Sequence, residues 1–533
     1  MGNTNITKVI LLNVPIENDY KHTIYFYDAK QQENYFKSLK VAEYEYDDFR
    51  YQRKDSTLNI PDAYDDVLKA NYIMYQNTYN SSKWYYAFIK NYEFLNEDTT
   101  RITIETDVMQ TWLDGIDYNI KESFIDREHT NDDTIGTNTV PEALETGEYI
   151  VYNSVDKFTS ISDVYIVVGV KGNLNKEVYD GTQYGGIYSG LRYFAFNKDE
   201  ISSLNQFIKD YSDAGLSDYI SCIFLAPSFL ITRMGDSFYA LGSQSYSTDF
   251  IKLNKKVYRD ISDYKPKNNK LLCFPYRYLM VTNNNGSSTI YQYEHFTTDS
   301  DLVEDQDNMN FGIMGCLTPG CSIRMSPTKY KGKEINYEEG LNLGKFPICN
   351  WTSDEYTNWL TQNSVNIAVN GAVGIGQIVG GIALTVGSSG AGSAIGLSMV
   401  ASGLTQVVGQ LGQVYQASFT PPQSRGNINN GDVITSQGLN TFSFYGMGIK
   451  SEYMKIIDDF FNVYGYKTNR VKIPNKNHRS CWWYTKTIDI NIKNINVPLP
   501  DLNKIKECYN NGITFWKFGE RIRDYSYDNA IRN

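Results

Sequence analysis

A long stretch without charge places the strongest constraint on how this chain folds. No residue between Glu355 and Arg425 carries a charged side chain, although 21% of the 533 residues are charged. The stretch holds two apolar runs, Ile367 to Val386 and Ile395 to Val414, separated by the sequence GSSGAGS at 387–393. Each run has the roughly 20 residues that an α-helix needs to cross a bilayer, and Gly and Ser favour a turn between them. The sequence therefore predicts a helical hairpin that enters a membrane and returns.

Three kinds of position are expected within this hairpin. Apolar side chains would face lipid, glycines at GxxxG spacing would let helices approach closely, and glutamines would pair or line a pore. The predicted membrane-inserting residues are Ile367, Val369, Val373, Ile375, Ile378, Val379, Ile382, Leu384, Val386, Ile395, Leu397, Met399, Val400, Leu404, Val407, Val408, Leu411 and Val414. The predicted helix-contact residues are Gly376, Gly380, Gly392 and Gly396, and the candidate pore-lining residues are Gln377, Gln406, Gln410 and Gln413.

The same glycines make the hairpin unfavourable in water. Each glycine costs about 1 kcal/mol relative to alanine in a helix interior, and an exposed apolar surface of this size promotes aggregation. We therefore expect the segment to be sheltered until it meets a membrane. From these residues alone three interpretations stay open: a loop that inserts conditionally, a constitutive membrane anchor, and a hairpin buried permanently in a soluble core. The stretch GIGQIVG at 374–380 departs from dinucleotide-binding spacing and predicts no such site.

Composition and motifs argue against several functional classes. The net charge of −11 and the lack of long basic runs disfavour tight nucleic-acid binding. Seven scattered cysteines without a CxxC pair predict free buried thiols, and four histidines offer few zinc ligands. P-loop, HExxH and GxSxG motifs are missing, so we expect no enzyme, no catalytic residue, no cofactor and no metal.

Two local patterns that suggest chemistry have simpler explanations. His129 lies beside Glu128, but no nucleophile is evident near it, so a structural histidine is expected. The acidic cluster DSDLVEDQD at 299–307 lacks the glycine and register of a calcium loop and is expected to be a solvated loop. The N-terminus lacks a signal-peptide pattern, so synthesis in the cytoplasm of the producing cell is expected.

Periodicity predicts a chain that is mainly β with some α, an α+β fold. Strands with alternating or continuous apolar residues are expected at 83–94, 101–108, 163–172, 219–226 and 486–492, with a hairpin at 278–296 whose turn is rich in Asn and Gly. Helices are expected at 199–212, 451–466 and 499–512, the last two ending at Gly465 and Gly512. The first should place Ile201, Leu204, Phe207, Ile208 and Tyr211 on one face, and the second has Met454, Ile457, Phe461 and Tyr464 at helical spacing. A polar loop is expected at 131–148.

Two blocks of short motifs occur in a distinctive order and spacing. The N-terminal block contains VPIENDYKHTIYF (14–26), NYIMYQN (71–77), KWYYAFI (83–89), ETDVMQTWL (105–113) and SFIDREHT (123–130). The C-terminal block contains FFNVYGYKTNRVKIPN (460–475), CWWYTKT (481–487) and NGITFWK (511–517). With these motifs, and with a long uncharged Gly-rich loop before the second block, the chain resembles the tail-knob proteins of small short-tailed phages of Gram-positive bacteria, the phi29 type. The resemblance covers about 1–130 and 430–533.

This resemblance implies a homohexameric ring or tube at the distal end of a phage tail. Residues 1–135 and 426–533 would form the β-rich tube wall, 136–355 a β-rich outer knob, and 356–425 the membrane-active loop. The loops would plug the lumen and leave on infection, forming a channel through the host cytoplasmic membrane for genome ejection. Implied partners are other copies of the chain, the upper tail tube or collar protein, the tail-tip protein, membrane lipid, and genomic DNA that passes through the lumen without specific binding.

An alternative stays open beside this resemblance. The chain could be a phage-tail receptor-binding or cell-wall-degrading protein whose apolar segment is only buried core.

Overall fold

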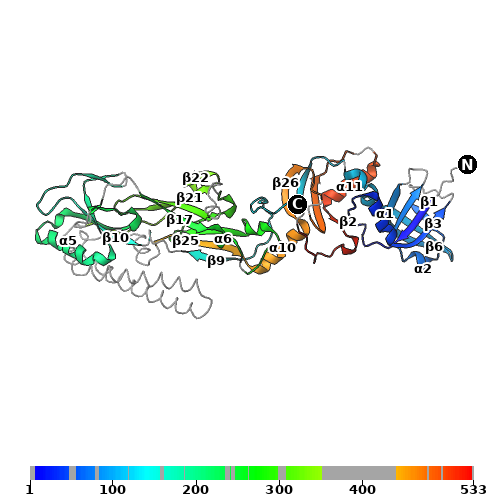
Figure 1. Cartoon of the computed structure of the whole chain (residues 1–533), viewed down its shortest axis with the longest axis horizontal. Coiled ribbons are helices and arrows are strands. Elements are labelled where there is room, and N and C mark those ends of the chain that lie inside the picture. Colours follow the sequence, from blue (N-terminus) through cyan, green and yellow to red (C-terminus); the bar gives the residue numbers. More distant parts are fainter. Residues whose placement is uncertain are drawn as a thin grey trace, which may run out of the picture. The chain divides into compact units, whose positions relative to one another are not determined.

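The chain folds into two compact units that are both rich in β-strands. The computed structural model describes residues 7–46, 56–77, 83–117, 119–155, 161, 163–184, 187–234, 240–241, 247–261, 263–297, 308–350, 440–476, 479–493 and 496–530. Unit 1 comprises Met1–Thr146, Tyr264–Leu271 and Ser451–Asn533, and unit 2 comprises Gly147–Asp263 and Leu272–Lys450. Figure 1 shows many strands and few helices in the described parts of each unit, which confirms the prediction of a mainly β chain with some α.

The N-terminal residues of unit 1 form an antiparallel six-stranded sheet with the order β3-β1-β5-β6-β7-β4. Its strands are β1 (Thr7–Leu12), β3 (Lys40–Tyr46), β4 (Thr57–Ile60), β5 (Tyr72–Asn77), β6 (Trp84–Asn96) and β7 (Thr99–Thr106), and helices α1 (Ala29–Ser38) and α2 (Tyr64–Val67) belong to the same region. In β7, Ile102 and Ile104 are buried while Thr103 and Glu105 are half-buried. This alternation confirms the period-two strand that the sequence predicts.

The strand predicted at 101–108 is too long by two residues, because Asp107 begins a helix. Oδ1 of Asp107 accepts hydrogen bonds from the backbone N–H groups of Met109 and Gln110, both at 3.0 Å. These bonds satisfy donors in the first turn of α3 (Val108–Asp117), as an N-cap side chain does. Burial raises the pKa of Asp107 to about 6. The cap at Asp107 thus ends the strand, although the apolar Val108 fits the alternating strand pattern.

A second sheet of unit 1 combines residues from both ends of the chain. Its order is β2-β28-β27-β8-β26, with β2 parallel to β28 and the other neighbours antiparallel. The strands are β2 (His22–Ile24), β8 (Ser123–Glu128), β26 (Tyr466–Lys472), β27 (Trp482–Asp489) and β28 (Ile513–Trp516). The strand predicted at 486–492 therefore begins four residues earlier and ends at Asp489, while Ile492 makes an isolated bridge to Ile120.

The two C-terminal helices of unit 1 end at the predicted glycines. Helix α10 (Ser451–Tyr464) is followed by Gly465 at φ +65°, and α11 (Leu499–Asn511) by Gly512 at φ +93°. Positive φ values favour glycine, which has no Cβ. On α10 the expected residues Met454, Ile457 and Phe461 are buried. Tyr464 departs from the prediction, since it is 40% exposed.

The described residues of unit 2 form three larger sheets and one hairpin. The sheet orders are β15-β16-β13-β10-β14-β24, β17-β20-β21-β22 with β23 paired to β21, and β19-β18-β25-β9, and β11 pairs with β12. The strands are β9 (Tyr149–Val155), β10 (Val164–Val170), β11 (Thr182–Tyr184), β12 (Ile187–Ser189), β13 (Arg192–Phe196), β14 (Ile220–Pro227), β15 (Arg233–Met234), β16 (Ala240–Leu241), β17 (Ser247–Asn254), β18 (Arg277–Thr282), β19 (Ser288–Tyr291), β20 (Asn308–Gly315), β21 (Ile323–Tyr330), β22 (Lys333–Ile335), β23 (Leu341–Asn342), β24 (Ile348–Asn350) and β25 (Ser443–Ile449). Within the described ranges, the α-helices of this unit are α5 (Ile201–Asp213) and α6 (Lys255–Arg259).

The predicted elements of unit 2 form close to their expected places. Strands β10 and β14 correspond to the predictions at 163–172 and 219–226, and β18 with β19 form the hairpin expected at 278–296. Helix α5 corresponds to 199–212 and buries Ile201, Leu204, Ile208 and Tyr211 along one face. Phe207, expected on that face, is only partly buried. These elements were predictable because their apolar periodicity is local.

Candidate functional site

The residues predicted to act on a membrane lie outside the described part of the structure. The described ranges stop at Asn350 and resume at Asn440, so all predicted inserting residues, helix-contact glycines and candidate pore-lining glutamines fall between them. The acidic cluster at 299–307 also lies outside the described residues. Among the helices that are described, none combines the length and apolar character that a membrane crossing requires. The described residues do include the two places where this segment is attached.

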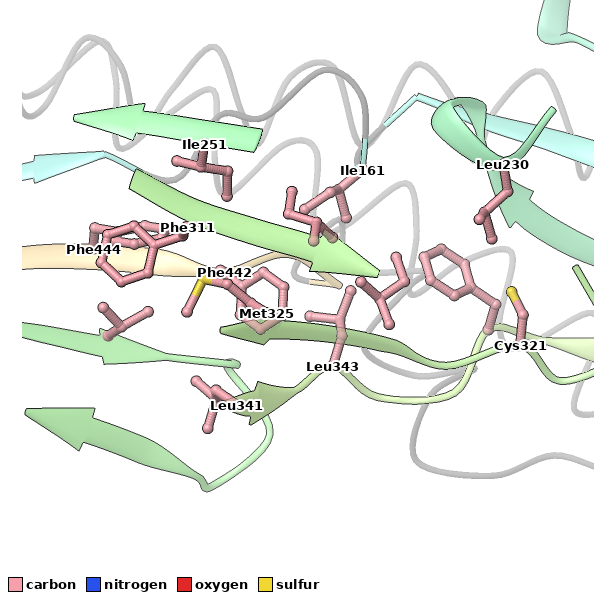
Figure 2. Packing of buried hydrophobic residues seen from close by; sticks show 14 of the residues in the cluster. Ile161, Leu230, Ile251, Phe311, Cys321, Met325, Leu341, Leu343, Phe442 and Phe444 are labelled. Atoms are coloured by element: carbon pink, nitrogen blue, oxygen red, sulfur yellow. The ribbon is translucent and has the colours of Figure 1, made fainter. Parts of the chain in front are cut away.

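Both attachment points belong to unit 2 and lead into one hydrophobic core. On the N-terminal side, β24 pairs with β14, and Phe346 just before it has no exposed surface. On the C-terminal side, Phe442 and Phe444 also have no exposed surface. All three phenylalanines belong to the same buried cluster. Figure 2 shows Phe442 and Phe444 directed among side chains from neighbouring strands, with Met325 and Leu343 close to Phe442.

Aromatic packing and sheet pairing fix the C-terminal attachment. The ring of Phe444 meets that of Phe311 edge to face, with centroids 5.2 Å apart. Strand β25 carries Phe444 between β18 and β9, so this strand is hydrogen-bonded on both sides. Burial of a large apolar side chain contributes about 1.5–3 kcal/mol. Phe442 and Phe444, two residues apart, therefore hold the C-terminal end of the segment in the core.

The turn between β18 and β19 adds a polar clamp at the same place. Asn284, at φ +56°, donates from Nδ2 to the Thr441 carbonyl and to the Ser443 hydroxyl, both at 3.0 Å. Asn283 donates from Nδ2 to the Asn342 carbonyl at 2.8 Å. The Asn and Gly residues predict this turn, because both adopt positive φ more readily than other residues. It does not reveal that the turn holds residues far along the chain, because side-chain partners are set by tertiary contacts.

In unit 1, His129 has a structural role. Its Nδ1 accepts the Tyr484 backbone N–H at 2.8 Å, which places the ring proton on Nε2, 3.1 Å from the Asn462 carbonyl oxygen. The residue is 1% exposed. Burial, with smaller contributions from the charges of Arg479 and Arg127, lowers the pKa of His129 to about 3. The ring is neutral and both of its nitrogens make hydrogen bonds, so it cannot serve as a general base. This confirms the structural role that the sequence predicts.

The buried neutral histidine predicts a loss of stability in acid. In the unfolded chain His129 titrates near its ordinary pKa of 6.5, whereas folding lowers its pKa to about 3. Its contribution is therefore complete above pH 6.5 and is lost as the pH falls toward 3. Between pH 7 and pH 5 we expect a loss of about 2 kcal/mol. A His129→Gln variant keeps one donor and one acceptor but does not titrate, and should lack this component.

Urea unfolding at the two pH values measures this component. Five of the seven tryptophans lie in unit 1, so their fluorescence reports its unfolding. Asp107 opposes the histidine, because a raised pKa adds stability as the pH falls through 6. The informative quantity is therefore the difference between the wild-type and variant pH dependences. If the free energy of unfolding depended on pH equally in the wild type and in His129→Gln, a buried neutral His129 would be contradicted.

The buried carboxylates of unit 1 are occupied by structural hydrogen bonds. Asp458 accepts from the Tyr264 hydroxyl and the Lys267 backbone N–H, both at 2.7 Å, and from the Asn268 side chain at 2.7 Å. Asp132 accepts from the Asn269 backbone N–H and from a buried tyrosine hydroxyl. These acids hold the segment Tyr264–Leu271 within unit 1. The sequence shows the acidic residues but not their partners, about 130 to 190 residues away.

The described residues do not form a metal site, and their buried cysteines are not reactive thiols. Within the ranges given above, no group of three or more His, Cys, Asp or Glu side chains is arranged to hold a metal ion. Cys321, Cys481 and Cys508 are free and buried, as predicted. Burial raises the pKa of Cys321 and Cys508 to about 12, so both stay protonated. Cys316 departs from the prediction in being only partly buried.

Comparison with known proteins places these features in a family. A sequence model of the C-terminal domain of tail knob protein gp9 from Bacillus phage phi29 matches residues 238–530, over half of the chain. A model of the N-terminus of caudoviral major tail proteins matches residues 3–117. The chain is 26% identical to tail knob protein gp9 of Bacillus phage phi29 and 28% identical to that of Bacillus phage PZA. Both alignments cover all of this chain and 99% of the relative.

A solved structure supports the same assignment at the level of fold. The tail knob protein gp12 of bacteriophage C1 superposes with a TM-score of 0.66, covering 99% of this chain and 100% of that chain at 14% identity. The relatives are named tail knob proteins, which agrees with the prediction of a tail component that is not an enzyme. The chain is therefore a virion tail component and belongs to the family of the phi29 tail knob protein gp9.

Proposed function

We propose that this protein forms a homohexameric tube and knob at the distal end of the tail. The apolar loops at 356–425 plug the lumen before infection and are then released into the host cytoplasmic membrane. There they form a channel through which the genome leaves the virion without specific binding to the protein. The upper tail tube or collar protein and the tail-tip protein are its neighbours in the virion. N- and C-terminal regions build the tube wall, and the middle region builds the outer knob.

The observation that carries this proposal is the way the segment is attached. Phe346 and Phe442 lie on either side of the undescribed residues and belong to one core. That core is formed by strands on both sides of the segment and includes 29 buried residues, all between Ile161 and Phe346 or at Phe442 and Phe444. A loop whose two ends are fixed in such a core has the architecture that conditional insertion needs, because the loop can move while its anchors stay.

Leakage from lipid vesicles tests this proposal. The intact protein should release a trapped dye from liposomes, and a variant lacking 365–416 should not, because only the first carries the two apolar runs. Circular dichroism should show that the deletion stays folded, and electron microscopy should show rings for both proteins. If the deletion unfolds, the segment is part of the core and the receptor-binding alternative gains support.

A pair of single substitutions separates insertion from general surface effects. Ile378→Lys places a charge within the first apolar run, at a cost of about 2.5–3.5 kcal/mol at a bilayer centre. It should strongly reduce dye release. Ile456→Lys makes the same change on α10, where the side chain is 67% exposed, and should leave release unchanged. Equal loss of release in both variants would contradict insertion through 365–416.

A further inference from the structure

Strand β26 of unit 1 contains a β-bulge that changes which face of the strand one basic side chain points to. Lys467 pairs with Arg127 and Arg470 pairs with Ile125, so three steps along β26 match two steps along β8. Asn469, at φ +46°, lies within this bulge. In a regular strand, residues three apart point to opposite faces. The extra residue therefore brings Lys467 and Arg470 onto the same face.

This face forms one wall of a small cavity. Lys472 follows Arg470 by two residues and so joins the same side of the strand. All three cations line a cavity of about 260 Å³. The 130–140 loop also lines the cavity, with polar side chains that include those of Thr130 and Asn138. The lining contains no Asp or Glu.

One nearby acid neutralises Lys472, and the other two cations of the cavity have no such partner among the described residues. Glu128 pairs with Lys472 and also accepts the Asn475 backbone N–H. A second buried acid, Glu142, pairs with two other basic side chains. Among the described residues, neither the Lys467 ammonium nor the Arg470 guanidinium has a carboxylate partner. In a chain with a net charge of −11, this cavity keeps a local excess of positive charge.

A second cavity of unit 1 provides a contrast. Its volume is about 580 Å³, and its walls include three carboxylates and three cations, contributed by Asp132, Asp133, Asp528, Lys265, Lys267 and Arg479. The formal charges there balance. Only the smaller of these two cavities combines three cations, neutral donors and no acid in its lining.

We propose that this smaller cavity is a binding site for a phosphate group. Arginine binds phosphate oxygens through its planar guanidinium, and lysine binds them as a compact charge. The Thr130 hydroxyl donates to Asn138 Oδ1, and one Asn138 amide hydrogen goes to the Asn131 carbonyl. The second Asn138 amide hydrogen is left as a neutral donor for a phosphate oxygen. The group is either free phosphate or one unit of a flexible phosphodiester chain. Strand β26, with its bulge, places all three cationic residues at the cavity before the ligand arrives.

Phosphate-dependent stabilisation tests the site on the full-length protein. The melting temperature of unit 1, followed by tryptophan fluorescence, should rise with orthophosphate relative to chloride at equal ionic strength, because a ligand of the folded state stabilises it. Arg470→Gln and Lys467→Gln should each weaken binding about tenfold, the effect of losing one charge-assisted contact. Arg470 is exposed, so its substitution should not impair folding.

A charge-matched control distinguishes a site from general electrostatics. Lys69→Gln removes one charge from an exposed pair with Asp66 elsewhere in unit 1 and should leave binding unchanged. Glycerol-phosphate oligomers and single-stranded oligonucleotides extend the test. Binding of either that is lost in Arg470→Gln identifies a phosphodiester chain as the ligand, and binding of orthophosphate alone identifies free phosphate. The proposal fails if phosphate gives no stabilisation, or if Lys69→Gln weakens it as much as Arg470→Gln does.

Discussion

Replacing Gly465 by alanine should destabilise unit 1 by about 2–5 kcal/mol. The backbone at this position has φ +65°, where a side chain costs about 1–2 kcal/mol. A Cβ atom there would lie 2.3 Å from the Glu128 carbonyl oxygen and 2.5 Å from the His129 backbone nitrogen. Neither backbone atom can rotate away, so overpacking adds about 1–3 kcal/mol. The expected readout is a lower urea midpoint in tryptophan fluorescence.

The control for this variant is a glycine with the same backbone conformation but open surroundings. Gly215 has φ +70°, and no heavy atom lies within 4 Å of a Cβ built on it. Gly215→Ala should therefore cost unit 2 only about 1–2 kcal/mol, measured by circular dichroism. Equal losses for the two variants would show that the contact with β8 does not matter. The comparison isolates the close approach of the α10 end to β8.

Replacing Glu142 by glutamine should cost about 3–5 kcal/mol, the typical penalty for breaking a buried ion pair. Its side chain is fully buried and pairs with Lys270 and Arg127, which are 2% and 13% exposed. It also accepts the Lys467 backbone N–H at 2.9 Å. Glutamine preserves the shape but removes the charge, so two largely buried cations would lose their carboxylate. Urea unfolding of unit 1 measures the loss.

An exposed pair in the same unit provides the control. Glu45 pairs with Lys8 at 2.6 Å, and both side chains are more than one-third exposed. Glu45→Gln should change stability by no more than about 1 kcal/mol, because water screens surface ion pairs. A Glu142→Gln variant as mild as this control would show that solvent reaches the buried cluster. It would contradict the view that the cluster holds the 130–142 loop and residues 264–271 in place.

Local sequence patterns predicted many of the helices and strands that the structure describes. Strand β7 and helix α5 were predictable because alternate or helical spacing of apolar side chains is a property of neighbouring residues. The helix ends at Gly465 and Gly512 were also predictable, because glycine readily adopts the positive φ that often ends a helix. The main errors lay at element ends, as at Asp107, where a capping bond decides the boundary. The membrane-active segment itself stays a prediction from its uncharged, Gly-rich composition.

The polar loop at 131–148 shows where sequence reasoning stops. Its composition predicts a solvated connection, yet Asp132 and Glu142 are buried and bind partners from distant parts of the chain. Nothing in the local pattern distinguishes these acids from the many exposed ones. A buried carboxylate is stable only when donors surround it, and those donors come from segments that folding brings together.

The sequence by itself determined the β-rich class, the family, and the presence of one long uncharged segment, because periodicity, motif order and composition are written along the chain. Only the tertiary structure decided that the segment is anchored by Phe346 and Phe442 in one core. It also decided that the bulge at Asn469 gathers three cations around one cavity. Both features depend on contacts between residues far apart in the chain, and such contacts follow from packing and register.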